Sequence, residues 1–236
     1  MPPGPEPELA RVVWNRATRI IASRYPPIDL FERVTPDPAV WEALIAAEML
    51  VNPRVRDQIG EIALVPPNER ISGPGASYVM ASFTHRNPKG SRFGDGSYGV
   101  YYAAIDFPTA LGEAAFHFAR FAQDSGDGIR HEDMRVLVGS VDEAFHDIAS
   151  LPAALRAAVL DPDSYVASRA LGARLRAAGS NGVVYPSVRR AGGTCLGAFR
   201  PKAVRPPVQS WHIRYRYDGA RVTAWFDYGT GGWHSL

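Results

Sequence analysis

The stretch GSRFGDGSYGVYYAAIDFPTALGEAAFHFARFA, residues 90–122, carries the clearest structural signals in the sequence. Glycine, serine and aspartate around Arg92 are typical of a loop. The next residues, 99–105, have the aromatic and β-branched content of a strand. Residues 107–123 have apolar side chains at helical spacing, with Asp106 or Thr109 as the N-cap. The stretch therefore predicts a loop, a strand and a helix in succession.

Residues on either side of this stretch predict a mixture of helices and strands. After a proline-rich tail, helical spacing predicts an N-terminal helix over residues 8–25. Residues 26–34 predict a break and a short strand. A second helix is predicted to start at Asp37 and Pro38 and to end near Asn52. Further elements are predicted over residues 77–83 (a strand or short helix), 134–145 (strand), 163–179 (helix), 181–188 (strand), 192–201 (strand) and 209–227 (a hairpin with an Asp-Gly turn).

The order of these elements predicts an α+β fold, with helices packed on a bent or split mixed sheet. The predicted elements divide the chain into an N-terminal tail and helix, residues 1–30, and a single domain, residues 31–236. A chain of 236 residues is long enough to bury a large core without disulfides or metals.

Composition narrows the class of protein. A composition of 46% hydrophobic and 21% charged residues is typical of a globular protein. The formal net charge is +2 and the arginines are dispersed, which does not favour direct nucleic-acid binding. The single cysteine, Cys195, cannot form an internal disulfide, and no zinc-binding spacing is present. We expect a cytoplasmic protein with no signal peptide, no membrane segment and no metal.

Glu113 is the one carboxylate in the apolar helix predicted over residues 107–123. Its neighbours one turn away, Ala110, Phe116 and His117, place it on or beside the buried face. An ionised carboxylate in that position needs hydrogen-bond donors or a cation. Arg92, in its glycine-bounded loop, is suited to binding a phosphate. An outward-facing glutamate and an ordinary turn remain the alternatives.

Ser187 stands just past the end of a predicted buried strand, next to arginines and a Gly-Gly pair. Side chains at such strand ends often contact ligands, although a solvated turn serine has the same pattern. A serine hydrolase is disfavoured because Tyr185 and Arg189 replace the glycines of a nucleophile elbow. None of the six histidines is spaced as a partner base, but His117 lies one turn from Glu113 and could line the same cleft.

The motifs NPKGSRFGDGSYGVYYAAIDFPTALGEAAFH (87–117) and GVVYPSVRRAGGTCLGAFRP (182–201), in this order, resemble the RES-domain toxins of bacterial toxin–antitoxin modules. The resemblance covers residues 31–217. It departs from the family at SRFGDG, where relatives typically have Gly-Arg-Trp-Asn. Matched residue by residue, the family's site residues are Arg92, Tyr102, Glu113 and Ser187, with a further arginine at Arg33.

The resemblance implies a fold similar to ADP-ribosyltransferases and an enzyme that destroys NAD, as a phosphorylase or a glycohydrolase. NAD would be the substrate rather than a cofactor, with inorganic phosphate as a possible co-substrate. Glu113 would stabilise the ribose cation, Arg33 and Arg92 would neutralise the pyrophosphate, Tyr102 would contact the nicotinamide ribose and Ser187 would position a hydroxyl or the acceptor. The implied partners are an Xre-type antitoxin and a second copy in a homodimer.

Two other functions remain open at the level of sequence. A protein ADP-ribosyltransferase would use the same pocket but pass the ribose to a macromolecule. A non-catalytic nucleotide-binding or interaction module would keep Glu113 only for structure. The aromatic tail, with Trp225, Phe226, Tyr228 and Trp233, completes the core or forms a partner surface, and we expect core completion.

Overall fold

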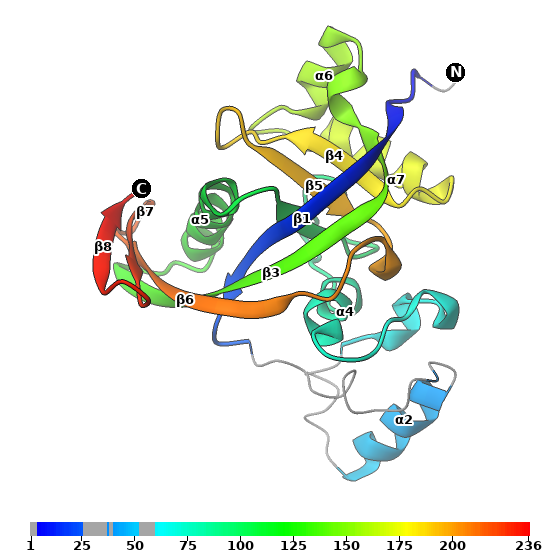
Figure 1. The fold of residues 1–236 in the computed structure, drawn as a ribbon, viewed down its shortest axis with the longest axis horizontal. Helices are drawn as coiled ribbons and strands as arrows, with labels where there is room; N and C mark the ends of the chain where they lie inside the picture. The colour runs from blue at the N-terminus through cyan, green and yellow to red at the C-terminus, as the bar shows by residue number, and fades with distance from the viewer. Residues whose placement is uncertain (1–3, 26–36, 38–39, 52–59) are drawn as a thin grey trace.

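The computed structural model describes residues 4–25, 37, 40–51 and 60–236. Within them, eight strands form one mixed sheet in the order β1-β2-β5-β4-β3-β6-β7-β8 (Figure 1). Every pairing is antiparallel except that of β3 with β4. The strands are Glu8–Ala22 (β1), Tyr101–Ala104 (β2), Arg130–Asp147 (β3), Gly182–Pro186 (β4), Thr194–Ala198 (β5), Val208–Tyr217 (β6), Val222–Asp227 (β7) and Gly232–Ser235 (β8).

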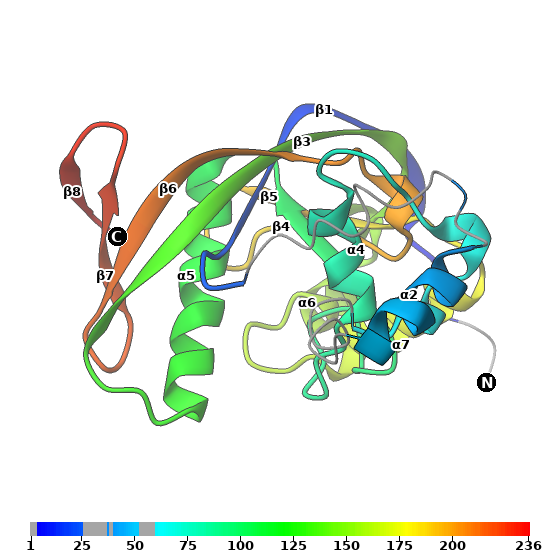
Figure 2. The same ribbon diagram turned by 90° about the horizontal axis from the view of Figure 1, so that it is seen from below.

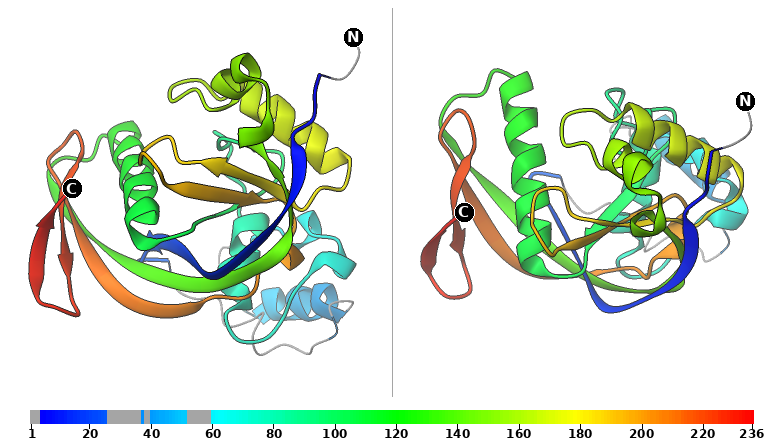
Figure 3. Two further views of the ribbon diagram at one scale, coloured as in Figure 1. Left: turned by 45° about the horizontal axis from the view of Figure 1, so that its top comes forward. Right: turned by 90° about the horizontal axis from the view of Figure 1, so that it is seen from above.

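The sheet is divided into two groups of strands, as the prediction of a bent or split sheet required. β1 pairs with β3 along its whole length, and β6, β7 and β8 extend this long-strand group. β2, β5 and β4 form a short-strand group. Only the pair Thr18–Ala104 joins β1 to β2, and only two pairs, His146–Val183 and Asp147–Val184, join β3 to β4. Figure 3 shows the long strands curving around the short ones.

The prediction of a helix over residues 8–25 is wrong, because residues 8–22 form the strand β1. The pairing with β3 shifts between Trp14 and Ala17, where a β-bulge inserts one extra residue. A bulge reverses which side chains face which side of the sheet. Val12 and Ala17 therefore pack into one hydrophobic core and Ile20 into the other. The resulting spacing of apolar residues resembles that of a helix, although the segment is a strand with one buried face before the bulge and apolar side chains in both cores after it.

The described residues contain five α-helices (Figure 2). They are Trp41–Val51 (α2), Ala76–Thr84 (α4), Phe107–Asp124 (α5), Ala153–Val159 (α6) and Val166–Ala177 (α7), and short 3-10 helices span Ile62–Leu64, Pro67–Glu69, Ile148–Ser150 and Pro201–Ala203. α5 and α7 contribute to one hydrophobic core, whereas α2 and α4 contribute to a second. None of these helices is long and apolar enough to cross a bilayer.

Most of the predicted elements are confirmed, with shifted ends. α2 starts at Trp41 rather than at Asp37, and it stops at Val51, next to the predicted end. Residues 77–83, predicted as a strand or short helix, lie within the helix α4. The sequence did not predict α6 or β8. The short strand predicted over residues 26–34, with Arg33 and the boundary near residue 30, lies outside the described residues.

The C-terminal hairpin turns at Asp218 and Gly219 as predicted, with Gly219 at a φ of 98°. The aromatic tail beyond it has two roles. Trp225 packs on Phe107, with ring centroids 5.1 Å apart, and so joins the core. Tyr228 and Trp233 are 45% and 46% exposed. Core completion is therefore correct for Trp225, and the other two rings lie at the surface.

Candidate active site

Glu113 lies in the second turn of α5. The helix begins where Asp106 predicts, because the Asp106 side chain accepts a hydrogen bond of 2.8 Å from the backbone N–H of Thr109. The Glu113 side chain is 18% exposed. It therefore neither points into bulk solvent nor lies fully in the core, and its carboxylate is accessible from one side.

Ser187 is brought onto Glu113 by the loop between β4 and β5. The loop is closed by a 2.9 Å hydrogen bond from the Ser187 N–H to the Gly193 carbonyl. A Cβ on Gly193 would come within 2.6 Å of Thr109 Oγ1, so only glycine lets the loop pack this closely on α5. Ser187 Oγ donates a 2.6 Å hydrogen bond to Glu113 Oε1. It also accepts hydrogen bonds from the backbone N–H groups of the next loop residues, Arg189 and Arg190.

Cys195, on β5, is a second neighbour of the same carboxylate oxygen. Its Sγ lies 3.8 Å from Glu113 Oε1, at the distance of a weak S–H donor. Burial and the nearby Glu113 charge raise the pKa of the Cys195 thiol. The group is therefore protonated at neutral pH and can donate. Sequence reasoning treated Cys195 only as evidence about disulfides, because β5 and α5 meet only in the folded chain.

The second carboxylate oxygen, Oε2, accepts no hydrogen bond from any described residue. His117 Nε2 lies 4.0 Å away, one helical turn further along α5. Burial lowers the pKa of His117, Arg189 and Arg92 lower it further, and Glu113 partly opposes them. This shift favours the neutral imidazole. This arrangement leaves Oε2 as the oxygen that can face a ligand.

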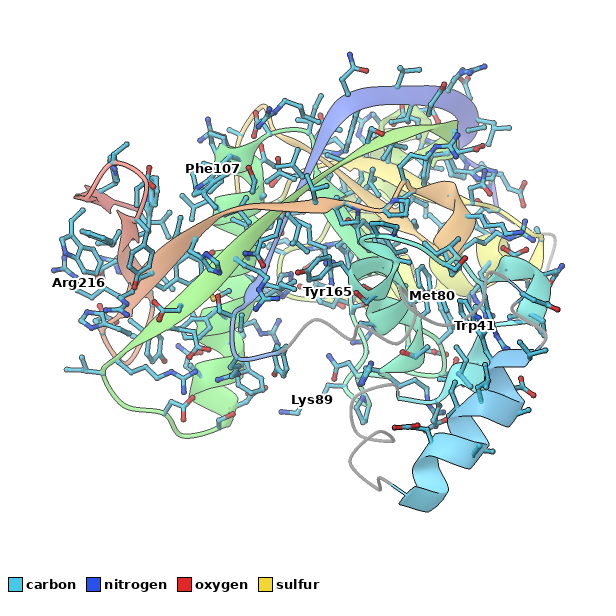
Figure 4. All side chains as sticks on the ribbon, turned by 60° about the horizontal axis from the view of Figure 1, so that its bottom comes forward. Trp41, Met80, Lys89, Phe107, Tyr165 and Arg216 are labelled. Carbon is cyan, nitrogen blue, oxygen red and sulfur yellow. The ribbon has the colours of Figure 1, made fainter. Side chains whose placement is uncertain are left out.

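Arg92 is held in the loop before β2 and is only 5% exposed. Its Nη1 donates hydrogen bonds to the carbonyls of Val159, at 3.3 Å, and Asp161, at 2.8 Å. Its guanidinium carbon lies 4.5 Å from the centroid of the Tyr165 ring, and Figure 4 labels this tyrosine near the centre of the molecule. Arg92 thus contacts the connection between α6 and α7, while its Nε and Nη2 make no hydrogen bond with the described residues.

Tyr102 fixes the conformation of the Arg92 loop. The ring lies over Gly197, its partner on β5, where a Cβ would approach the ring to 3.1 Å. The Tyr102 hydroxyl accepts a 2.9 Å hydrogen bond from the Phe93 N–H and lies 2.8 Å from Ser91 Oγ. Burial raises the pKa of Tyr102 to about 12, so the phenol stays protonated. The Tyr102 hydroxyl therefore contacts both residues that flank Arg92 in the sequence, Ser91 and Phe93.

Two further arginines, which sequence reasoning missed, support this loop. Arg169 on α7 donates to the carbonyls of Ser91, at 2.9 Å, and Lys89, at 2.7 Å. Arg19 on β1 donates a 2.8 Å hydrogen bond to the Tyr102 carbonyl. No local signal marks either residue, because both contacts join segments far apart in the sequence.

The structure brings the predicted residues Arg92, Tyr102, Glu113 and Ser187 into one region. The charges of Arg92 and Glu113 both act on the pKa values of His117 and Cys195. Arg33 lies outside the described residues. Two cavities open elsewhere, beside Gly179 and Arg200, and neither is lined by Arg92 or Glu113. The described residues contain no cluster of side chains able to hold a metal ion.

Comparison with known proteins identifies the family. The model of the RES domain matches residues 68–218. The chain belongs to the RES-domain family. The matched range contains Arg92, Tyr102, Glu113 and Ser187, and β1, which carries Arg19, precedes it. The resemblance predicted from the sequence motifs is confirmed.

Two similar proteins cover most of this RES-domain chain. The uncharacterized protein y4oC of Sinorhizobium fredii is 27% identical over 214 residues, which are 91% of this chain and 88% of that protein. The crystal structure of the M. tuberculosis MbcT-MbcA toxin-antitoxin complex contains a chain that is 12% identical, with a TM-score of 0.39. That match covers 90% of this chain and 88% of the other.

Proposed function

We propose that this RES-domain protein is the toxin of a bacterial toxin–antitoxin module and that it degrades NAD by cleaving the nicotinamide–ribose bond. The 2.6 Å hydrogen bond between Ser187 Oγ and Glu113 Oε1 is the observation that carries the proposal. It joins Glu113 on α5 to Ser187 in the motif of residues 182–201, and it leaves the other carboxylate oxygen, Oε2, free for a ligand.

The proposed reaction needs a carboxylate of this kind. When the bond between ribose C1′ and the nicotinamide nitrogen breaks, its electron pair leaves with nicotinamide, which becomes neutral. Positive charge then develops on the ribose, and Glu113 Oε2 stabilises that charge most strongly in the transition state. An oxygen of water or of inorganic phosphate forms the new bond to C1′ and releases a proton to solvent.

The neighbouring groups have supporting roles in this scheme. Ser187 and Cys195 hold Oε1, which fixes the direction of the carboxylate without neutralising its charge. The free Nε and Nη2 of Arg92 bind phosphate oxygens of the substrate. Tyr102 and Arg169 keep the Arg92 loop in place before the substrate arrives.

A product assay with purified protein tests the proposed activity. Wild-type protein should release nicotinamide from NAD, and the isosteric variant Glu113→Gln should be slower by about 100-fold or more, because it keeps the shape but loses the charge. Parallel reactions with and without inorganic phosphate identify the acceptor. An unchanged NAD concentration with folded wild-type protein would overturn the proposal. Label from NAD that persists on protein would favour ADP-ribosyl transfer instead.

Membership in the RES-domain family also supports an antitoxin partner, which we propose to be of the Xre type. Induced expression should stop bacterial growth while cellular NAD falls, and expression of Glu113→Gln should do neither. Growth arrest with a constant NAD concentration would contradict the proposal. We further propose a cytoplasmic homodimer, and light scattering on purified protein would measure its mass.

A further inference from the structure

Arg189 lies in the loop between β4 and β5, two residues beyond Ser187, and its side chain reaches across to two other elements. Its guanidinium carbon lies 3.4 Å from the centroid of the Phe116 ring on α5. Its Nη2 donates a 2.5 Å hydrogen bond to the Pro162 carbonyl, in the connection between α6 and α7. Three elements of the site therefore meet at this one side chain.

Arg189 and Arg92 approach the same short segment from two different loops. Arg92 donates to the carbonyls of Val159 and Asp161, and Arg189 donates to the carbonyl of Pro162, the next residue. Phe116, on which Arg189 lies, directly precedes His117, the residue beside Glu113 Oε2. The charges of both guanidinium groups also lower the pKa of His117, the residue beside Glu113 Oε2, so both arginines act on the same region as the carboxylate.

The contacts of Arg189 leave most of its hydrogen-bonding capacity unused. A guanidinium has five N–H groups. Within the described residues, the side chain makes a hydrogen bond only to Pro162, so Nε and Nη1 have no acceptor. Stacking on an aromatic ring holds the plane of the guanidinium without occupying those edges. A planar cation held by its face, with free N–H groups at its edge, is suited to binding a phosphate.

We infer that Arg189 is a second substrate-binding arginine of this site and that, together with Arg92, it recognises the pyrophosphate of a dinucleotide. This inference rests on the proposed function and extends it to the choice of substrate. Two arginines match the two charges of a pyrophosphate. They favour a dinucleotide over a mononucleotide with one phosphate, and a mononucleotide over a nucleoside with none.

Adjacent arginines provide a matched pair of variants. Arg190 is next in the loop, and its side chain is exposed and makes no hydrogen bond, ion pair or ring contact with the described residues. Arg189→Gln and Arg190→Gln remove the same charge from the same loop and leave the backbone N–H groups in place. For NAD, Arg189→Gln should raise KM by about 10-fold to 100-fold, the loss expected for a charged hydrogen bond, with a smaller change in kcat. Arg190→Gln should behave as wild type.

Substrates with fewer phosphates show whether the effect comes from phosphate binding. The increase in KM caused by Arg189→Gln should be smaller for nicotinamide mononucleotide and absent for nicotinamide riboside. A loss of loop structure would instead affect all three substrates alike. Equal KM values for NAD in the two variants would overturn the inference while leaving the proposed function intact.

Binding of inorganic pyrophosphate gives a second measurement that does not depend on turnover. Calorimetry should show weaker pyrophosphate binding to Arg189→Gln than to wild type or Arg190→Gln. Equal binding by all three proteins would overturn the inference even if NAD were not consumed. Thermal melting checks that the variants are folded. If Arg189→Gln fails to fold, Arg189→Lys, which keeps the charge but loses the planar N–H edge, should still bind pyrophosphate less well.

Discussion

Ser187 makes three hydrogen bonds with one hydroxyl group. It donates to Glu113 Oε1 and accepts from the backbone N–H groups of Arg189 and Arg190. The same side chain therefore sets the direction of the carboxylate and the shape of the loop that carries Arg189. Ser187 therefore links the Glu113 carboxylate to the loop that carries Arg189.

Replacing Ser187 with alanine should affect both stability and activity. Ser187→Ala removes a donor to a charged group and leaves two backbone donors without an acceptor. We expect the free energy of unfolding to fall by about 1–3 kcal/mol, measured by urea denaturation. Nicotinamide release should also slow, because the carboxylate loses its fixed direction. Ser235→Ala, at an exposed position on β8, should change stability by less than about 0.5 kcal/mol; an equal loss in both variants would contradict this account.

Cys195 should be chemically inert in the folded protein. The residue is 3% exposed, and its raised pKa keeps the thiolate scarce at pH 8. Iodoacetamide should therefore modify the native protein far more slowly than the protein in guanidinium chloride, as measured by mass spectrometry. Rapid modification of the native protein would show that the neighbour of Glu113 is accessible and ionised.

At the scale of elements, β1 is the segment whose structure differs most from its sequence pattern. Its bulge between Trp14 and Ala17 lets one strand supply apolar side chains to both hydrophobic cores. Pairing along the length of β3 places β1 within the sheet rather than beside it. The strand also carries Arg19, which holds the carbonyl of Tyr102.

Two adjacent valines test whether this segment is a strand. Val12 is 7% exposed and Val13 is 60% exposed, as alternation in a strand requires. Val12→Asp should lower the free energy of unfolding by about 3 kcal/mol or more, because it places a carboxylate in the core. Val13→Asp should change it by less than about 1 kcal/mol. Similar losses in both variants, measured by chemical denaturation, would argue against the strand.

At the scale of the whole molecule, the narrow junctions between the two strand groups need support from side chains. Arg19 supplies it at the junction of β1 with β2. It donates to the Tyr102 carbonyl on β2 and, at 3.1 Å, to Ser82 Oγ on α4, and it lies 4.7 Å from the centroid of the Tyr101 ring. Burial lowers the pKa of Arg19. The residue ties the long-strand group to the strand that carries Tyr102.

Arg19→Met should therefore weaken both the fold and the site. The variant leaves the Tyr102 carbonyl without its donor, and we expect the free energy of unfolding to fall by about 1–3 kcal/mol. Nicotinamide release should fall less than in Glu113→Gln, because Arg19 acts through Tyr102. Arg16→Met, at an exposed position in the bulge, is the control and should stay within about 0.5 kcal/mol of wild type. Unchanged stability in Arg19→Met would remove the proposed link between the two groups.

The sequence by itself determined the loop, strand and helix of residues 90–124, the hairpin at Asp218 and the residues of the RES motifs. These features depend on short-range preferences: glycine in loops, alternation or helical spacing of apolar residues, and the Asp106 cap. Such preferences act between residues close together in the chain, so the printed sequence contains them in full.

Only the tertiary structure decided that residues 8–22 form a strand, that Ser187 and Cys195 hold Glu113, and that Arg189 lies on Phe116. Each depends on partners from distant segments. A strand gains its hydrogen bonds from another strand, and its bulge reverses the facing of side chains without leaving a local mark. Contacts between distant segments form only when the elements pack together. They produce no periodic pattern in the sequence, so the sequence does not predict them.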